Sequence, residues 1–119
     1  MKCKISLDNG KNGVFTARGD LNFGAEGFAL FYELDGDKCL LTYKNGTIVQ
    51  ERRGNVTMKM VFSQGKQTEC TLGEGGLSGS FPVFTNKIQI ENDPKSVDIK
   101  LYYNCAGESV ALHVFAAAY

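Results

Sequence analysis

The sequence is short of the residues that most often build a catalytic or metal centre. It has one histidine and two prolines among 119 residues, and its four cysteines form no C-x-x-C pair of the kind that binds zinc. No apolar run approaches the roughly 18 to 20 residues that span a bilayer. The N-terminus also lacks the apolar run of a signal peptide. These absences predict a cytosolic protein without a metal or cofactor.

The sequence also has no excess of positive or negative charge, because its 13 basic and 13 acidic residues cancel. That balance gives no charge-driven reason to expect nucleic acid or an anionic membrane as a partner. The 14 glycines suit many tight turns, and no long polar tract indicates a linker. Residues 1–119 are therefore expected to form a single domain, which at this length buries roughly two thirds of its unfolded surface.

The cysteines are far apart, and each is in phase with apolar neighbours. They are Cys3, Cys39, Cys70 and Cys105. The leading interpretation is a free thiol packed as a small hydrophobic group. Two disulfides would need an oxidising compartment that nothing else in the sequence supports.

Two dipeptides fix the strand register of the central stretch, Phe28 to Phe62. Asp35-Gly36 and Asn45-Gly46 are typical of two-residue type I′ turns, which need φ > 0 at both central positions. The first turn pairs Phe28 with Tyr43, Leu30 with Leu41, Tyr32 with Cys39 and Glu33 with Lys38. The second pairs Tyr43 with Ile48, Leu41 with Gln50 and Cys39 with Arg52. Both registers place the same side chains of the shared strand on one face.

The next turn decides whether Arg52 lies on that face. A three-residue loop, Arg53-Gly54-Asn55, sets Arg52 beside Val56 and keeps the register. A two-residue turn at Gly54-Asn55 would bring Arg53 and Glu51 to the inner face instead, against the register that Asn45-Gly46 sets. We therefore expect a charge, Arg52, and an amide, Gln50, on an otherwise apolar face.

The rest of the chain continues the same pattern of short strands and tight turns. We expect strands at Lys2 to Leu7, at Val14 to Leu21 with a bulge at Gly19, at Leu77 to Phe84 with a break or bend at Pro82, and at Lys87 to Glu91. A final hairpin turns at Ala106-Gly107 and pairs Leu101 with Leu112. No segment has a sustained helical period, so little or no helix is expected. About eight to ten antiparallel strands then form an all-β sandwich or, as the meander favours, a single up-and-down barrel.

The stretch from Tyr32-Glu33 to Phe62 resembles the YwiB-like family, small bacterial proteins of unknown function. The carrying residues are Tyr32, Glu33, Arg52, Gly54, Val56, Met58 and Phe62, followed by Thr85, Ile99, Leu101 and Tyr103. The resemblance covers most of the chain from about Gly27 onward. It implies a calycin-type (lipocalin-like) β-barrel in a bacterial cytosol, and it implies no activity.

Arg52 is the main candidate for binding, because a guanidinium cannot shed its charge and needs acceptors when it is buried. It could bind a carboxylate or phosphate of a ligand, with Gln50, Tyr32 and Tyr43 as further hydrogen-bonding groups. Tyr103 belongs to the same inner face. Arg52 could instead close the barrel end by donating to backbone carbonyls or to the C-terminal carboxylate. The tyrosines could equally be large core residues.

No catalytic arrangement can be built from the remaining residues. His113, the single histidine, falls opposite Lys100 on the outer face and is expected to be solvated. Glu33 and Lys38 are interpreted as an exposed ion pair of little energetic weight. The chain is therefore more plausibly a binding protein than an enzyme.

Apolar residues also gather on the expected outer face, where Phe31 pairs with Leu40 and Val49 follows on a later strand. Such a cluster indicates either a homodimer interface or a covering helix that the sequence pattern does not reveal. Three functions remain open. The first is binding of a small amphipathic or anionic ligand in the lumen, and the second is a filled barrel that acts through its outer face. The third is an isomerase or cyclase in which Arg52 and Tyr32 polarise an oxygen.

Overall fold

The chain forms one closed, antiparallel β-barrel in which each strand pairs with its neighbours in sequence and β1 pairs with β10. The structure is a computed structural model that describes residues 1–119. Its strands are β1 (Lys2–Asp8), β2 (Val14–Phe23), β3 (Gly27–Leu34), β4 (Asp37–Lys44), β5 (Thr47–Arg53), β6 (Val56–Ser63), β7 (Gln67–Glu74), β8 (Leu77–Asp93), β9 (Ser96–Cys105) and β10 (Glu108–Ala118). The predicted all-β, up-and-down barrel is confirmed, and the sandwich is not formed.

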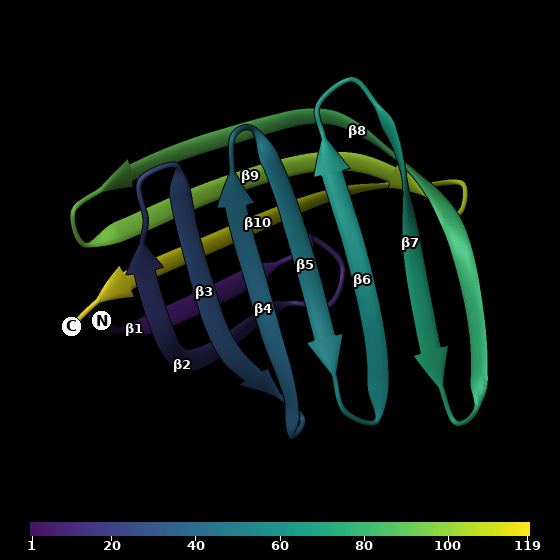
Figure 1. The fold of residues 1–119 in the computed structure, drawn as a ribbon, viewed down its shortest axis with the longest axis horizontal. Helices are drawn as coiled ribbons and strands as arrows, with labels where there is room; N and C mark the ends of the chain where they lie inside the picture. The colour runs from purple at the N-terminus through teal and green to yellow at the C-terminus, as the bar shows by residue number, and fades with distance from the viewer.

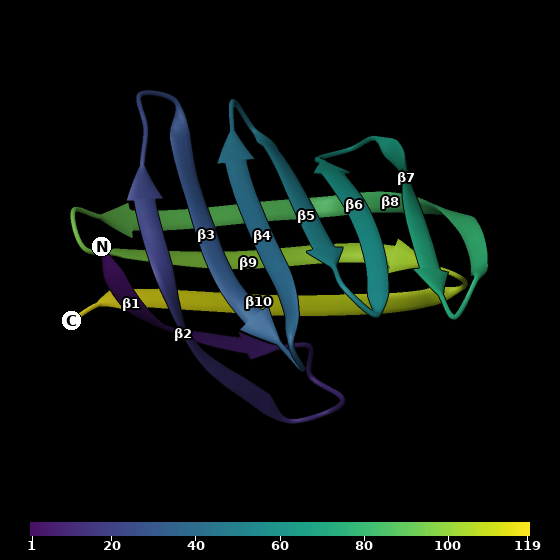
Figure 2. The ribbon, with the colours of Figure 1, turned by 60° about the horizontal axis from the view of Figure 1, so that its bottom comes forward.

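The barrel is flattened into two layers whose strands cross (Figure 1). Strands β2 to β7 lie side by side in one layer, and β8, β9, β10 and β1 run across them in the other. Figure 2 shows the same crossing after a rotation, with the two termini close together at one end. The 17-residue strand β8 curves from the side of β7 into the second layer.

The two dipeptide turns have the geometry that the sequence predicts. The φ angles are 50° and 82° at Asp35 and Gly36, and 50° and 83° at Asn45 and Gly46. All the cross-strand pairs expected from these turns are present in β3, β4 and β5. The final hairpin also turns as expected, with φ of 52° at Ala106 and 78° at Gly107. Local turn chemistry therefore fixed the register of three hairpins.

The turn between β5 and β6 is wider than the predicted three-residue loop. Arg52 pairs with Met58, and not with Val56. Because the difference is two residues, the inner face keeps the same side chains and Arg52 still lies on it. The wider turn is held by a side chain from another strand, Asp37, which accepts hydrogen bonds from the backbone of Asn55 and Val56. A contact of this kind cannot be read from the turn sequence.

Neither of the two expected strand irregularities, at Gly19 and at Pro82, is present, and the irregularity of β8 lies at a different position. Gly19 pairs regularly with Cys3 on β1 and Tyr32 on β3, so it is not a bulge. An added Cβ at Gly19 would collide with the Phe31 carbonyl, so glycine is needed there for close approach of two strands. Strand β8 continues through Pro82, and its register shifts between Thr85 and Lys87 instead.

The inward-facing side chains form a single core of 18 buried residues, three of them cysteines. All four cysteines are free, and burial raises the pKa of the thiols of Cys3, Cys39 and Cys70. The structure contains no helix long and apolar enough to cross a membrane.

No helix covers the outer face, so the covering-helix alternative is wrong. Phe31 on β3 and Phe115 on β10 are 44% and 40% exposed. Glu33 and Lys38 lie opposite each other as predicted, but they do not form the expected ion pair.

Candidate functional site

A buried carboxylate, Asp37, organises the barrel end where β3 turns into β4. Its side chain is only 3% exposed and accepts three hydrogen bonds. The donors are Arg52 Nε at 2.8 Å, the Asn55 backbone N–H at 2.8 Å and the Val56 backbone N–H at 3.2 Å. The hydrogen bond from Arg52, followed by that from Asn55, holds the pKa of Asp37 below its usual value. Asp37 therefore fixes both the Arg52 side chain and the β5–β6 turn.

Glycine at position 54 is required by the same carboxylate. An added Cβ at Gly54 would collide with Asp37 Oδ1 and with the carbon that carries it. Because the Asp37 side chain is short and held by three donors, it cannot move aside without breaking those hydrogen bonds. The R-x-G segment, Arg52 to Gly54, thus belongs to one arrangement around Asp37.

Arg52 lies on the inner face near the barrel end, as predicted, and contacts a carboxylate there. Only its Nε is hydrogen-bonded, so the two terminal amino groups of the guanidinium have no protein acceptor. The side chain is 20% exposed, and Arg52 lines a surface groove together with Met58 and Leu72. Sequence reasoning missed Asp37 as the acceptor. The signal was available, because Asp37 is two residues before Cys39 and therefore shares its face.

The inner face becomes accessible beside Arg52. In the barrel centre the inward side chains of Met60, Cys70 and Val83 are at most 7% exposed. Two residues further toward the β5–β6 and β7–β8 turns, Met58 is half-buried and Leu72 and Phe81 are 37% and 39% exposed. Arg52 pairs with Met58, and Met58 pairs with Leu72. We call Arg52, Met58, Leu72 and Phe81 the open corner.

A small cavity, the mouth cavity, lies where the β1–β2 loop meets the two layers, and Gln50, two residues before Arg52 on β5, lines it. It has a volume of about 240 Å³. Polar groups of Tyr32 and Gln50 line it together with apolar side chains, and the β1–β2 loop closes one side. The apolar lining residues are Leu7, Phe15, Leu34 and Leu112. Burial, and then the neighbouring Cys39, raise the pKa of Tyr32 to about 12, so its phenol remains a hydrogen-bond donor at neutral pH.

The other two predicted site tyrosines lie elsewhere in the barrel. Tyr43 packs on Phe28 at the opposite end of β4, with 5.5 Å between ring centroids. Tyr103 packs on Phe62 at 4.8 Å, and burial raises its pKa to about 12. The structure therefore brings Arg52, Gln50 and Tyr32 to one end and leaves Tyr43 and Tyr103 as core aromatics.

His113 lies opposite Lys100 on the outer face, as predicted. It is not simply solvated, because its Nε2 is 2.7 Å from Asp98 Oδ1. No group of three or more histidine, cysteine, aspartate or glutamate side chains lies close enough together to hold a metal ion.

Comparison with known proteins identifies a family and a fold. Residues 1–111 match a family described as a domain of unknown function, DUF1934. No curated protein matches the chain. The crystal structure of the ywiB protein from Bacillus subtilis is similar, with a TM-score of 0.79, 19% sequence identity and coverage of 99% of this chain and 89% of that one. At this identity, the similarity supports the same barrel fold and nothing further.

Proposed function

The chain belongs to the DUF1934 family, and from its geometry we propose that it binds a small amphipathic anion at the open corner without catalysing a reaction. The observation that carries the proposal is the Arg52 guanidinium. It is anchored through Nε, has two free amino groups, and lies beside apolar inner-face side chains that are not covered.

The anionic head of the ligand would bind the free edge of Arg52. A guanidinium presents parallel N–H donors that match two oxygens of a carboxylate, sulfonate or phosphate. Asp37 accepts a hydrogen bond from Nε only, which leaves the donors of both terminal amino groups for another acceptor. The Tyr32 phenol and the Gln50 amide lie on the same inner face and line the mouth cavity. They could donate further hydrogen bonds to the head or to a linking group.

The apolar part of the ligand would lie over Met58, Leu72 and Phe81. Exposed apolar side chains next to convergent polar groups are typical of ligand sites, and methionine adapts to different shapes. At about 240 Å³, the mouth cavity is smaller than the roughly 300–1,000 Å³ of most ligand pockets. The proposed ligand therefore lies across the barrel mouth and does not occupy an enclosed lumen.

A non-catalytic role is supported by the lack of a free base on this face. Tyr32, with its pKa raised to about 12, is protonated at neutral pH. The Asp37 carboxylate has a lowered pKa and already accepts three hydrogen bonds, which makes it a poor proton acceptor. The isomerase or cyclase alternative therefore lacks its acid–base partner. We further propose a cytosolic location, which the four free thiols support.

Titration with 8-anilinonaphthalene-1-sulfonate, a fluorescent amphipathic anion, tests the proposal. The folded protein should bind the dye, and Phe81→Gln should weaken binding about tenfold because an apolar contact is lost. Arg52→Gln should weaken it about tenfold or more through loss of charge-assisted hydrogen bonds. Phe84→Gln is the matched control, because Phe84 is 41% exposed but lies on the outer face.

Circular dichroism would establish that each variant remains folded before its affinity is compared. Equal affinity of the wild type, Phe81→Gln and Phe84→Gln would place the dye elsewhere and refute the open corner as its site. Absence of dye binding to the folded wild type would refute the proposal itself.

The second candidate function is self-association through the outer face of β3 to β5. The observation in its favour is Phe31, which is 44% exposed and pairs with Leu40, while Val49 lies on the next strand. Light scattering should then give about twice the 13.0 kDa chain mass. Leu40→Lys should convert the dimer to a monomer by placing a charge in the interface. A wild-type protein that is already monomeric would exclude this function.

A further inference from the structure

Basic side chains from four strands form a row on the outer face of the barrel. Lys4 on β1 pairs with Arg18 on β2, and Lys38 on β4 pairs with Arg53 on β5. Strand β3 contributes the only carboxylate of the row, Glu33, which lies opposite Lys38. All five side chains are exposed. We call Lys4, Arg18, Lys38 and Arg53 the basic row.

The pairing within the basic row is unfavourable for the isolated protein. Like charges directly opposite each other on neighbouring strands destabilise a sheet, and the row contains two such pairs. Lys4 and Lys38 form no ion pair, and Arg53 pairs only with Glu51, at 3.2 Å. A polyanion that crosses the strands would relieve both repulsions at once.

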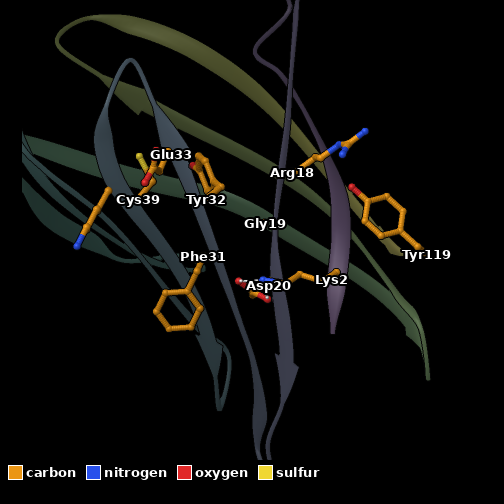
Figure 3. A pocket seen from close by; sticks show the side chains of 10 residues that line it. Lys2, Arg18, Gly19, Asp20, Phe31, Tyr32, Glu33, Cys39 and Tyr119 are labelled. Atoms are coloured by element: carbon orange, nitrogen blue, oxygen red, sulfur yellow. Dashed lines mark hydrogen bonds and ion pairs between the residues drawn. The ribbon is translucent and has the colours of Figure 1, made fainter.

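A groove of about 550 Å³ lies in the middle of the row, and both Arg18 and Lys38 line it. Figure 3 shows it from close by, with Arg18, Phe31 and Tyr119 labelled. Two exposed aromatic side chains lie at its edges. Phe31 is 44% exposed, and Tyr119 is 70% exposed with the Arg18 guanidinium 5.9 Å from its ring centroid. The groove also contains Lys2, which is paired with Asp20 at 3.1 Å. Cations beside accessible aromatic rings are the combination that binds phosphates and stacked bases together.

We propose that this outer face binds single-stranded nucleic acid, with phosphates along the basic row and bases on Phe31 and Tyr119. The row crosses from β1 to β5, about 19 Å at the usual spacing between strands, so it can contact more than one phosphate. A single strand is favoured over a duplex because its bases are free to stack on the rings. The site is separate from the open corner and does not depend on the ligand binding proposed there. It needs Phe31 to be exposed, so it excludes self-association through the outer face of β3 to β5.

The neutral net charge does not oppose this site. Electrostatic attraction at contact distance depends on the charges within about one Debye length, roughly 8–10 Å, and the basic row is a local excess of positive charge. The groove itself contains the carboxylates of Asp20 and Glu33, and Tyr119 carries the C-terminal carboxylate. Asp20 is paired with Lys2, and Glu51 next to the row is paired with Arg53. The cations Lys4, Arg18 and Lys38 have no ion-pair partner, so they still outnumber the unpaired carboxylates.

Fluorescence anisotropy with labelled ten-nucleotide oligo(dT) and oligo(rU) tests the proposal at two salt concentrations. The double variant Lys38→Gln/Arg53→Gln should bind about tenfold more weakly than the wild type. The slope of log affinity against log salt should become shallower by about 1.4, because two phosphate contacts are lost and each contributes roughly 0.7 on a single strand. Phe31→Ala should weaken binding about fivefold or more with an unchanged salt slope, since it removes stacking and no charge.

The matched control is Lys66→Gln/Lys95→Gln, which removes the same charge from two exposed turns. It should bind as the wild type does. Equal losses in the two double variants, or no binding at low salt, would overturn the proposal. If polyglutamate displaces the labelled oligonucleotide as well as unlabelled oligonucleotide does, the site is a general polyanion surface. If a mononucleotide does so, the site holds only one nucleotide. Either result would also overturn the single-strand assignment.

Discussion

The two ends of β4 face the barrel interior with opposite chemistry. At one end Tyr43 packs on Phe28, and Phe28 contacts Phe23 edge-on at 6.3 Å between centroids. At the other end Asp37 and Arg52 form an ion pair at 2.8 Å, and the inner face beside them is partly exposed. The barrel is thus filled by aromatic packing at one end and held by a charged network at the other.

The difference shows what each kind of contact permits. Aromatic rings pack on one another largely through their apolar surfaces, so this packing requires no matched donors and acceptors. A charged network needs matched donors and acceptors. Asp37 accepts hydrogen bonds from Arg52 Nε and from the backbone of Asn55 and Val56, so the terminal amino groups of Arg52 remain without an acceptor. The end with unused donors is the one at which we propose a ligand site. The aromatic end contributes to stability through buried ring contacts.

The largest effect is expected at the aromatic end. Phe28 is 6% exposed, and Phe28→Ala removes a ring that contacts two others. The free energy of unfolding should fall by about 3–5 kcal/mol, the range for a buried Phe→Ala change. Urea denaturation measures this loss. Phe31→Ala on the outer face of the same strand is the control, and comparable losses in the two variants would contradict the role of Phe28 as a core residue.

An intermediate effect is expected at the charged end. Arg52→Ala leaves the Asp37 carboxylate without its side-chain donor and should cost about 1–3 kcal/mol in the free energy of unfolding. Arg53→Ala should change it by less than about 0.5 kcal/mol, because the Arg53 side chain is 80% exposed. Urea denaturation of both variants tests the difference. Equal, small losses would show that the Arg52–Asp37 pair does not stabilise this end.

The smallest effect concerns pH. Asp37 has a folded-state pKa below its ordinary value of 3.8, chiefly through the Arg52 hydrogen bond. Its contribution to stability is therefore present above pH 3.8 and is lost as the pH falls through the lower, folded-state value. The wild type should have a higher thermal midpoint than Asp37→Asn near neutral pH, and the gap should narrow as the solution is made more acidic. A gap that stays constant down to about pH 2 would contradict this assignment.

Much of the fold could be predicted because its signals are local. Asp35-Gly36, Asn45-Gly46 and Ala106-Gly107 each adopt positive φ, and the alternating residues beside them fix which side chains face inward. The position of Arg52 on the inner face followed from two of these turns. The third turn was predicted too short, since its width depends on Asp37, which lies 18 residues before Asn55.

The sequence by itself determined an antiparallel meander, the registers of the hairpins with two-residue turns and the inner face, because turn chemistry and two-residue alternation act over a few residues. Only the tertiary structure decided which tyrosines join Arg52, where the inner face stays open, and that Lys4, Arg18, Lys38 and Arg53 share a row. Those relations depend on how far two strand layers cross and where the barrel closes. The counts of 13 positive and 13 negative residues do not say where on the surface each charge lies. Closure of the barrel decides which charged side chains become neighbours.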